Sequence, residues 1–162
     1  GQLRSVTFER AGALAEILFY HLTESKLEDA LPPLLEKSVE RGWKVTVQTA
    51  DPARCDALDT HLWTYRDDSF LPHGTDATEG AEDQPVLITS QEGNINGATV
   101  RFLVDGAQPP EALDYDRVVF VFDGHNQEQL EGARLQWKKL KTEGHKLTYW
   151  QQTNEGRWEK KA

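Results

Sequence analysis

The sequence predicts an α/β fold, a three-layer α/β/α sandwich around a mostly parallel, mixed sheet. Short apolar stretches of strand length alternate along the chain with segments of helical period, and residues 117–122 are apolar enough to form a central strand. Right-handed crossovers between parallel strands place helices on both faces of such a sheet. With 162 residues, of which 38% are hydrophobic, the chain is expected to bury a single core.

The first 14 residues are predicted to lie outside this core. They show no clear strand or helix period, and the sequence contains no methionine. We therefore interpret residues 1–14 as a leader or a tag-derived extension, and residues 15–162 as one α/β domain.

Six strands are predicted from short apolar or alternating stretches bounded by turn residues. They cover residues 16–22, 43–49, 85–89, 99–104, 117–122 and 146–150. The polar segment between the second and third of these strands is predicted to hold a helix followed by a long loop. The residues after the last strand are predicted to form a short tail.

Three helices are predicted from their starting signals. Ser25 and Glu28 have the spacing of a capping box, in which each side chain bonds the other residue's backbone N–H. Asp51 followed by Pro52 predicts an N-cap with proline at the first helical position. The third helix is predicted over residues 126–143 and is rich in basic side chains.

Charge is distributed unevenly along the chain. The whole chain carries a net charge of −9, yet residues 130–162 contain eight Lys and Arg against four Asp and Glu. Part of this surplus falls on the third helix, where Arg134, Trp137 and Lys138 are close together. A cationic helix with an aromatic ring favours an acidic, partly hydrophobic peptide as its partner, because the acidic body repels the phosphates of DNA.

Several classes of function lack their sequence signals. No glycine-rich phosphate loop occurs, so a Rossmann-like sheet without a nucleotide pocket is expected. The histidines lack a two-His metal spacing, and Cys55 is expected to be a small buried residue, so neither a metal nor a cofactor is predicted. No segment approaches the roughly 20 apolar residues of a membrane span, which predicts a cytoplasmic protein without membrane contact.

Two other functions remain open from the residues alone. Asp123 and His125 follow the predicted central strand, where a small α/β enzyme would hold an acid and a base. The structural alternative is that Asp123 or Asn126 caps the third helix while His125 is solvated. Direct binding of single-stranded DNA by tryptophans and lysines is the other possibility, and the acidic charge argues against it.

A second aromatic position is predicted at the end of the second helix. Trp63 lies off the apolar stripe of that helix, so its ring is expected either to cover a loop or to line a binding site. The loop that follows contains Phe70, Leu71 and Pro72, an apolar element that packs inward or meets a partner.

Several of these segments resemble the chi subunit of bacterial DNA polymerase III. The resemblance covers residues 15–150 and rests on Leu62-Trp63, the Asp-Ser-Phe-Leu-Pro-His loop at 68–73, the strand at 117–123, and Ala133-Arg134-x-x-Trp137-Lys138. It implies a non-catalytic accessory subunit associated with the clamp loader. Such a subunit binds the acidic C-terminal tail of single-stranded DNA-binding protein, and so reaches DNA only indirectly.

The resemblance also implies roles for individual residues. In the family, the bound tail ends in aspartates and a phenylalanine carboxylate. The positions that match its receptor here are Trp63, Pro72, Arg134, Trp137 and Lys138, with Trp137 in place of a tyrosine of the best-known relatives. A receptor of this kind requires Trp63 and Arg134 to converge in space.

A second contact is implied by the same resemblance. Phe70 and Leu71 match the loop that meets the psi subunit or another clamp-loader component.

Overall fold

A computed structural model describes residues 14–65 and 71–162. Its strands are β1 (Glu16–Leu22), β2 (Val45–Gln48), β3 (His73–Thr75), β4 (Val86–Thr89), β5 (Val100–Leu103), β6 (Arg117–Asp123), β7 (Lys146–Gln152) and β8 (Trp158–Lys160). Its helices are α2 (Leu27–Glu40), α3 (Pro52–Thr64) and α4 (Gln127–Thr142), with a 3₁₀ turn, η1 (Ala81–Asp83). All six predicted strands and all three predicted helices are present.

The strands form one mixed sheet in the order β3-β4-β2-β5-β6-β1-β7-β8. Every neighbouring pair is parallel except β7 and β8, which pair antiparallel. Strand β6 is internal, between β5 and β1, and its five middle residues are buried. The predicted central strand is therefore confirmed.

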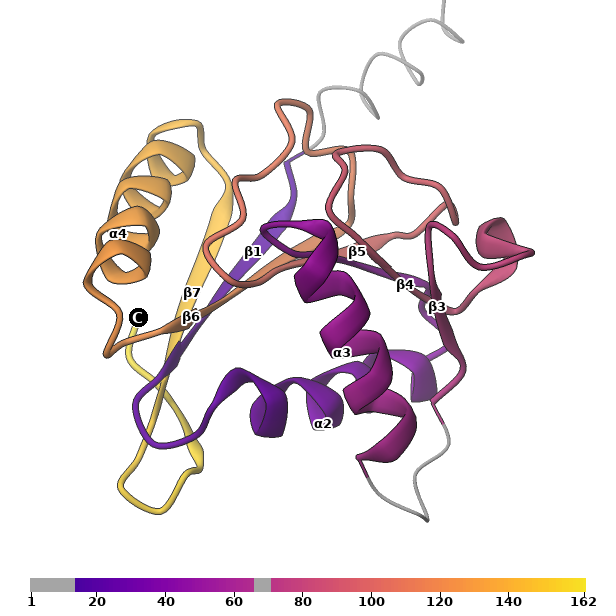
Figure 1. Cartoon of the computed structure of the whole chain (residues 1–162). Helices are drawn as coiled ribbons and strands as arrows, with labels where there is room; N and C mark the ends of the chain where they lie inside the picture. Colours follow the sequence, from indigo (N-terminus) through magenta and orange to yellow (C-terminus); the bar gives the residue numbers. More distant parts are fainter. Residues whose placement is uncertain (1–13, 66–70) are drawn as a thin grey trace, which may run out of the picture.

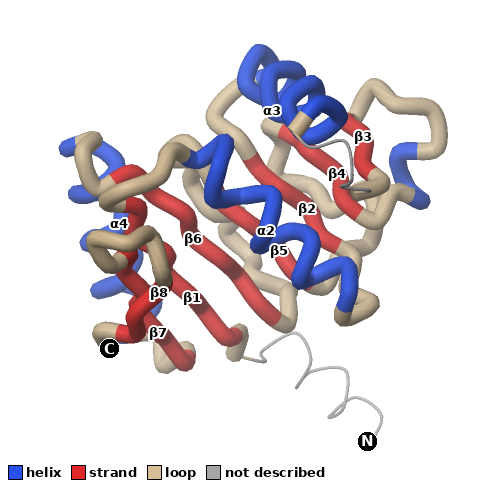
Figure 2. Tube along the Cα trace, turned by 90° about the horizontal axis from the view of Figure 1, so that it is seen from below, coloured by secondary structure: helices blue, strands red, loops and turns tan. Residues whose placement is uncertain are grey.

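Helices cover both faces of this sheet. Figure 2 shows α2 and α3 on one side of the strand layer and α4 on the other. Successive residues of a strand point to opposite faces, so β1 supplies Leu18 to the core under α2 and α3, and Phe19 to the core under α4. The predicted three-layer sandwich is confirmed.

Two short strands were not predicted from the sequence. Strand β3 begins at His73, inside a segment predicted as loop, and β8 begins at Trp158, inside the predicted tail. Each contains three residues and lies at an edge of the sheet. Three residues are too few to show an alternating pattern, so the backbone of the neighbouring strand decides whether they pair.

The predicted capping box at the start of α2 is wrong. The N-cap residue is Lys26, and it makes no side-chain cap. The side-chain oxygen of Gln152 instead accepts hydrogen bonds from the backbone N–H groups of residues 23–25, and its amide group donates to the Ser25 hydroxyl. An acceptor from β7, distant in sequence, thus organises the turn before the helix.

The other two helix starts agree with the sequence prediction. The Asp51 carboxylate accepts from the backbone N–H of Arg54, with Pro52 at the first helical position. The Asn126 side chain accepts from the backbone N–H of Gln129 at the start of α4. Local side-chain acceptors are therefore enough to begin both helices.

A buried arginine holds the loops on the α4 face of the sheet. Arg101 on β5 is fully buried. Its guanidinium donates two hydrogen bonds to the Gln48 side chain, one to the Tyr115 hydroxyl, and one each to the carbonyls of Gln91 and Gly93. All five guanidinium donors are satisfied, so the loops before and after β5 depend on one side chain.

The Arg101→Ala variant is expected to lose about 3 kcal/mol or more of unfolding free energy, because it leaves several buried acceptors unpaired and opens a cavity. Urea unfolding followed by tryptophan fluorescence measures the loss. The exposed Arg157 offers a matched control, and Arg157→Ala should change stability by less than about 0.5 kcal/mol. Equal stability of the two variants would contradict this role of Arg101.

Candidate protein-binding site

Helix α4 places one charged edge beside an apolar face. Ala133 and Leu140 are buried against the sheet, whereas Arg134 and Lys138 are exposed one turn apart. Trp137 is half-buried between these two sets. The helical spacing therefore brings two cations to the border of the apolar stripe, as the sequence predicts.

An apolar hollow of about 510 Å³ lies along this edge of α4. Its walls are Leu130, Ala133, Arg134, Trp137 and Lys138 from α4, Phe122 from β6, Tyr149 from β7, and Ala162. Figure 1 shows the chain beyond β8 returning beside α4. The backbone of Tyr149 bonds with residues 161 and 162 on that side, which fixes this wall of the hollow.

Aromatic packing fixes the floor of the hollow. The Trp137 ring lies edge-on to Phe19 at 5.3 Å and to Tyr149 at 5.7 Å between ring centroids. Phe19 is itself stacked on Phe120 at 4.5 Å. Edge-to-face and stacked rings hold one another in defined positions, so the hollow is present before any partner binds.

Arg134 is the cation that faces this aromatic floor. No ion pair joins it to another residue within 14–65 or 71–162. Burial raises the pKa of Tyr149, and the nearby positive charge of Arg134 opposes that shift. Burial together with Arg134 lowers the pKa of His21, whose ring bonds to the Tyr149 hydroxyl at 2.8 Å. The charge of Arg134 is therefore available to an incoming anion.

Trp63 is exposed at the end of α3, as the sequence predicts. Its side chain is 58% exposed, and its ring lies 4.2 Å from that of His73. His73 is buried and bonds the carbonyls of Leu71 and Asp59, which fixes the start of β3. Pro72, between Leu71 and His73, is half-buried. Trp63 and Pro72 thus belong to the α3 and β3 end of the molecule.

The structure does not bring Trp63 and Arg134 together in the single receptor that was predicted. Helix α3 packs beside β3 and β4 on one face of the sheet, and α4 packs beside β6 and β7 on the other. Strands β2 and β5 lie between these two ends, and neighbouring strands of a sheet are about 4.8 Å apart. Arg134, Trp137 and Lys138 therefore share one site, while Trp63 and Pro72 lie at another.

The two residues predicted to contact psi have different outcomes. Phe70 lies outside the described residues. Leu71 is 5% exposed and packs in the core beneath α3, so it offers no surface to a partner. The structure therefore places Leu71 in the core and not on the surface that was predicted to meet psi.

Asp123 and His125 have hydrogen bonds that serve the turn before α4. The Asp123 carboxylate accepts from the backbone N–H of His125, and the His125 ring bonds the carbonyl of Thr23. Asn126 caps the helix, which is one of the structural alternatives predicted above. Within the described residues, no group of three or more His, Cys, Asp or Glu side chains is arranged to hold a metal ion.

Three residues at these sites were not predicted from the sequence. Phe122 and Tyr149 line the hollow, and His73 supports the Trp63 ring. Alternation along the strands at 117–122 and 146–150 placed Phe122 and Tyr149 on known faces, but it did not show which helix would cover those faces. His73 gave no local signal, because its partners come from α3 and the adjacent loop.

The family model described as DNA polymerase III chi subunit, HolC, matches residues 14–148. This match spans well over half of the sequence. The chain belongs to the DNA polymerase III chi subunit family. A relative from Rickettsia prowazekii (strain Madrid E), named "Probable DNA polymerase III subunit chi", is 24% identical over 156 residues, which cover 92% of this chain and 93% of the relative.

Membership in the chi family assigns the chain to DNA replication, as an accessory subunit of the polymerase III type. The resemblance predicted from the sequence is therefore confirmed at the level of the family. None of the helices described here has the length and apolar composition to cross a membrane.

Acid is expected to destabilise this chi-family chain partly through His21. The pKa of His21 lies below its ordinary value of 6.5, so the unfolded chain binds more protons as the pH falls through that value. This contribution to stability is present above pH 6.5 and is lost as the pH falls towards the folded-state pKa. Unfolding free energies measured between about pH 5 and pH 8 should therefore depend less on pH in His21→Gln.

The upper end of this pH range serves as the internal control. At about pH 8 the His21 ring is neutral in both states, so the two proteins should differ there by a constant offset only. An identical pH dependence in the wild type and the variant would show that His21 does not contribute.

Proposed function

We propose that the chain binds the acidic C-terminal tail of single-stranded DNA-binding protein in the hollow beside α4. The observation that carries this proposal is Arg134, a cation without an acidic partner among the described residues, at the edge of an apolar hollow. The hollow suits the tail's terminal phenylalanine. Arg134 is positioned for its carboxylate, and Lys138 for a neighbouring aspartate.

The energies expected for this contact are modest. Burying a phenylalanine side chain contributes about 1.5 to 3 kcal/mol, and a charge-assisted hydrogen bond about the same. Association and ordering of the tail offset much of that sum. A single tail therefore binds weakly, and several tails presented together on one partner raise the effective affinity.

The surface around Trp63 and Pro72 serves a second partner in this proposal, the psi subunit or another clamp-loader component. Trp63 is a large, exposed ring held against a buried histidine, and such rings are common binding hot spots. Because this surface and the hollow lie on opposite faces of the sheet, one chain is able to hold both partners at once. This arrangement would link the DNA-binding protein to the replicase.

In this proposal the chain has no catalytic role and does not bind DNA directly. The net charge of −9 opposes phosphate binding, and the cations beside α4 border a hollow suited to one phenyl ring. Titration with an oligonucleotide in the absence of single-stranded DNA-binding protein tests this point. Tight binding to the oligonucleotide alone would favour the direct DNA-binding alternative.

The Arg134→Ala variant is expected to bind the tail peptide at least about tenfold more weakly, which corresponds to about 1.4 kcal/mol. The physical reason is the loss of the charge-assisted hydrogen bond to the terminal carboxylate. Calorimetric titration with a peptide that ends in aspartates and phenylalanine measures the change. Added salt should weaken binding to the wild type more than binding to the variant.

Lys139→Ala is the matched control for Arg134→Ala. Lys139 is exposed on the same helix and carries the same charge, but it does not line the hollow. This control should retain nearly all of the tail affinity. Equal losses in the two variants would mean that general charge, and not the hollow, attracts the peptide.

The Trp63→Ala variant is expected to leave tail affinity unchanged, because Trp63 lies on the other face of the sheet from Arg134. It should weaken capture of the psi subunit or the assembled clamp loader by about 2 kcal/mol, the typical size of a hot-spot loss. Calorimetry with the tail peptide and pull-down with the clamp-loader complex measure the two effects separately. Loss of tail binding in Trp63→Ala would contradict the two-surface arrangement.

A further inference from the structure

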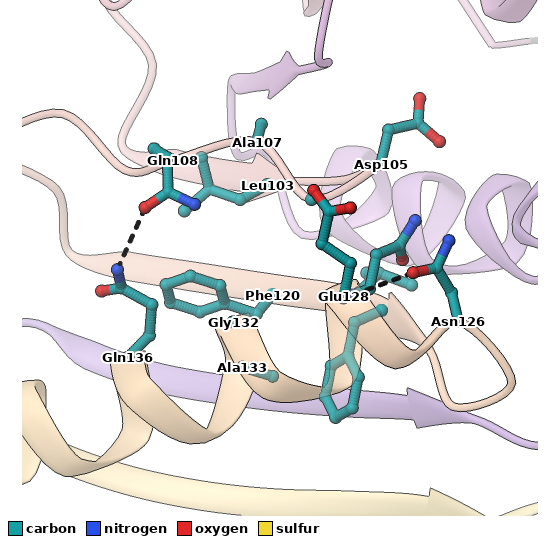
Figure 3. A pocket seen from close by; sticks show the side chains of 14 residues that line it. Leu103, Asp105, Ala107, Gln108, Phe120, Asn126, Glu128, Gly132, Ala133 and Gln136 are labelled. Carbon is teal, nitrogen blue, oxygen red and sulfur yellow. Dashed lines mark hydrogen bonds between the residues drawn. The ribbon is translucent and has the colours of Figure 1, made fainter.

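A second, smaller hollow lies on the other flank of α4. Its volume is about 200 Å³, and it is enclosed by α4 and by the ends of β5 and β6 with the loop after β5. Figure 3 shows the Phe120 ring between α4 and the β5 segment that carries Leu103. We call this space the acidic hollow, because Asp105 and Glu128 line it and neither Lys nor Arg is among its lining residues.

The acceptors of the acidic hollow lie at its two ends. Asp105 and Glu128 are at one end, and Gln108 and Gln136 are at the other (Figure 3). Asp105 already accepts two hydrogen bonds from Arg54, whereas Glu128 forms no ion pair within the described residues. Glu128 is therefore the carboxylate available to a ligand.

One acceptor in this lining is buried without a partner. The side-chain oxygen of Gln136 is shielded from solvent and forms no hydrogen bond, while its amide group donates to Gln108 at 3.4 Å. A buried acceptor without a donor is unfavourable. Because this oxygen is closed off from solvent, a ligand N–H group reaches it only after the amide, held by one long hydrogen bond, rotates towards the acidic hollow.

A glycine keeps the helix wall of the acidic hollow open. Gly132 lies in the interior of α4, where glycine disfavours the helix relative to other residues. A β-carbon at this position would meet no atom within 4 Å. The space beside Gly132 is therefore free to receive an atom group from outside the chain.

We propose that the acidic hollow binds an arginine side chain of a partner protein. Its volume is below the roughly 300 to 1,000 Å³ of pockets for drug-sized ligands and suits one long side chain. The apolar floor takes the aliphatic stem, and the Glu128 carboxylate matches the planar guanidinium. At the far end, rotation of the Gln136 amide brings its oxygen to a backbone N–H of the same partner. This site is independent of the tail-binding proposal, whose ligand has the opposite charge.

Nuclear magnetic resonance titration with Nα-acetyl-arginine-N-methylamide tests the site. We expect saturable shifts confined to residues 103–108 and 128–136. The neutral citrulline analogue should bind several-fold more weakly, as should the arginine probe to Glu128→Gln. N-propylguanidine, which has the same head group and the same single charge but lacks the peptide N–H groups, should also bind more weakly. Equal affinity for N-propylguanidine would show that the peptide N–H groups are not recognised and would overturn the proposal.

The Gly132→Leu variant tests whether probe binding depends on the open space in the acidic hollow, and its thermal unfolding shows whether the fold is kept. Leucine should fill the space and abolish probe binding, while the thermal unfolding temperature stays the same or rises because leucine favours the helix. Lys139→Leu adds the same side chain to α4 away from the acidic hollow, and it should leave probe binding intact. Absence of saturable shifts in the wild type, or undiminished binding in Gly132→Leu, would overturn the proposal. Tail binding beside Arg134 should survive in Gly132→Leu, so the two proposals fail independently.

Discussion

The right-handed crossover between parallel strands determines where every functional side chain of this protein lies. From β1 the chain crosses through α2 to β2 in one direction along the sheet, and from β6 it crosses through α4 to β7 in the other. Because both crossovers are right-handed, their opposite directions along the sheet place α2 and α4 on opposite faces. The loops around β5 then cover the part of the α4 face that no helix reaches, and Arg101 holds them there.

Helix α4 has a different chemistry on each flank of its buried stripe. Arg134 and Lys138 border the larger hollow, whose floor is aromatic, whereas Glu128 and Gln136 border the smaller acidic hollow. Ala133, on the buried side of α4, lines both hollows. The hollow bordered by Arg134 and Lys138 suits an acidic ligand, and the acidic hollow suits a basic one. An acidic chain thus presents a local cationic site without becoming attractive to nucleic acid at long range.

Much of the fold followed from local patterns. The bounds of β1 agreed with the apolar run, and Asp51 and Asn126 cap their helices as their residue types predict. Trp63 is exposed because it lies off the apolar stripe of α3. The capping box at Ser25 failed because the side-chain oxygen of Gln152, 127 residues away, accepts from the Ser25 backbone N–H that Glu28 was expected to bond.

The sequence by itself determined the six predicted strands, the three helices, the fold class, the family and the cationic edge of α4, because each of these depends on residues close together in the chain or on patterns along it. Only the tertiary structure decided that Trp63 and Arg134 lie on different faces, that Leu71 is core, and that Phe122 and Tyr149 complete the hollow. These outcomes depend on strand order and crossover direction. Side-chain periodicity carries no information about either.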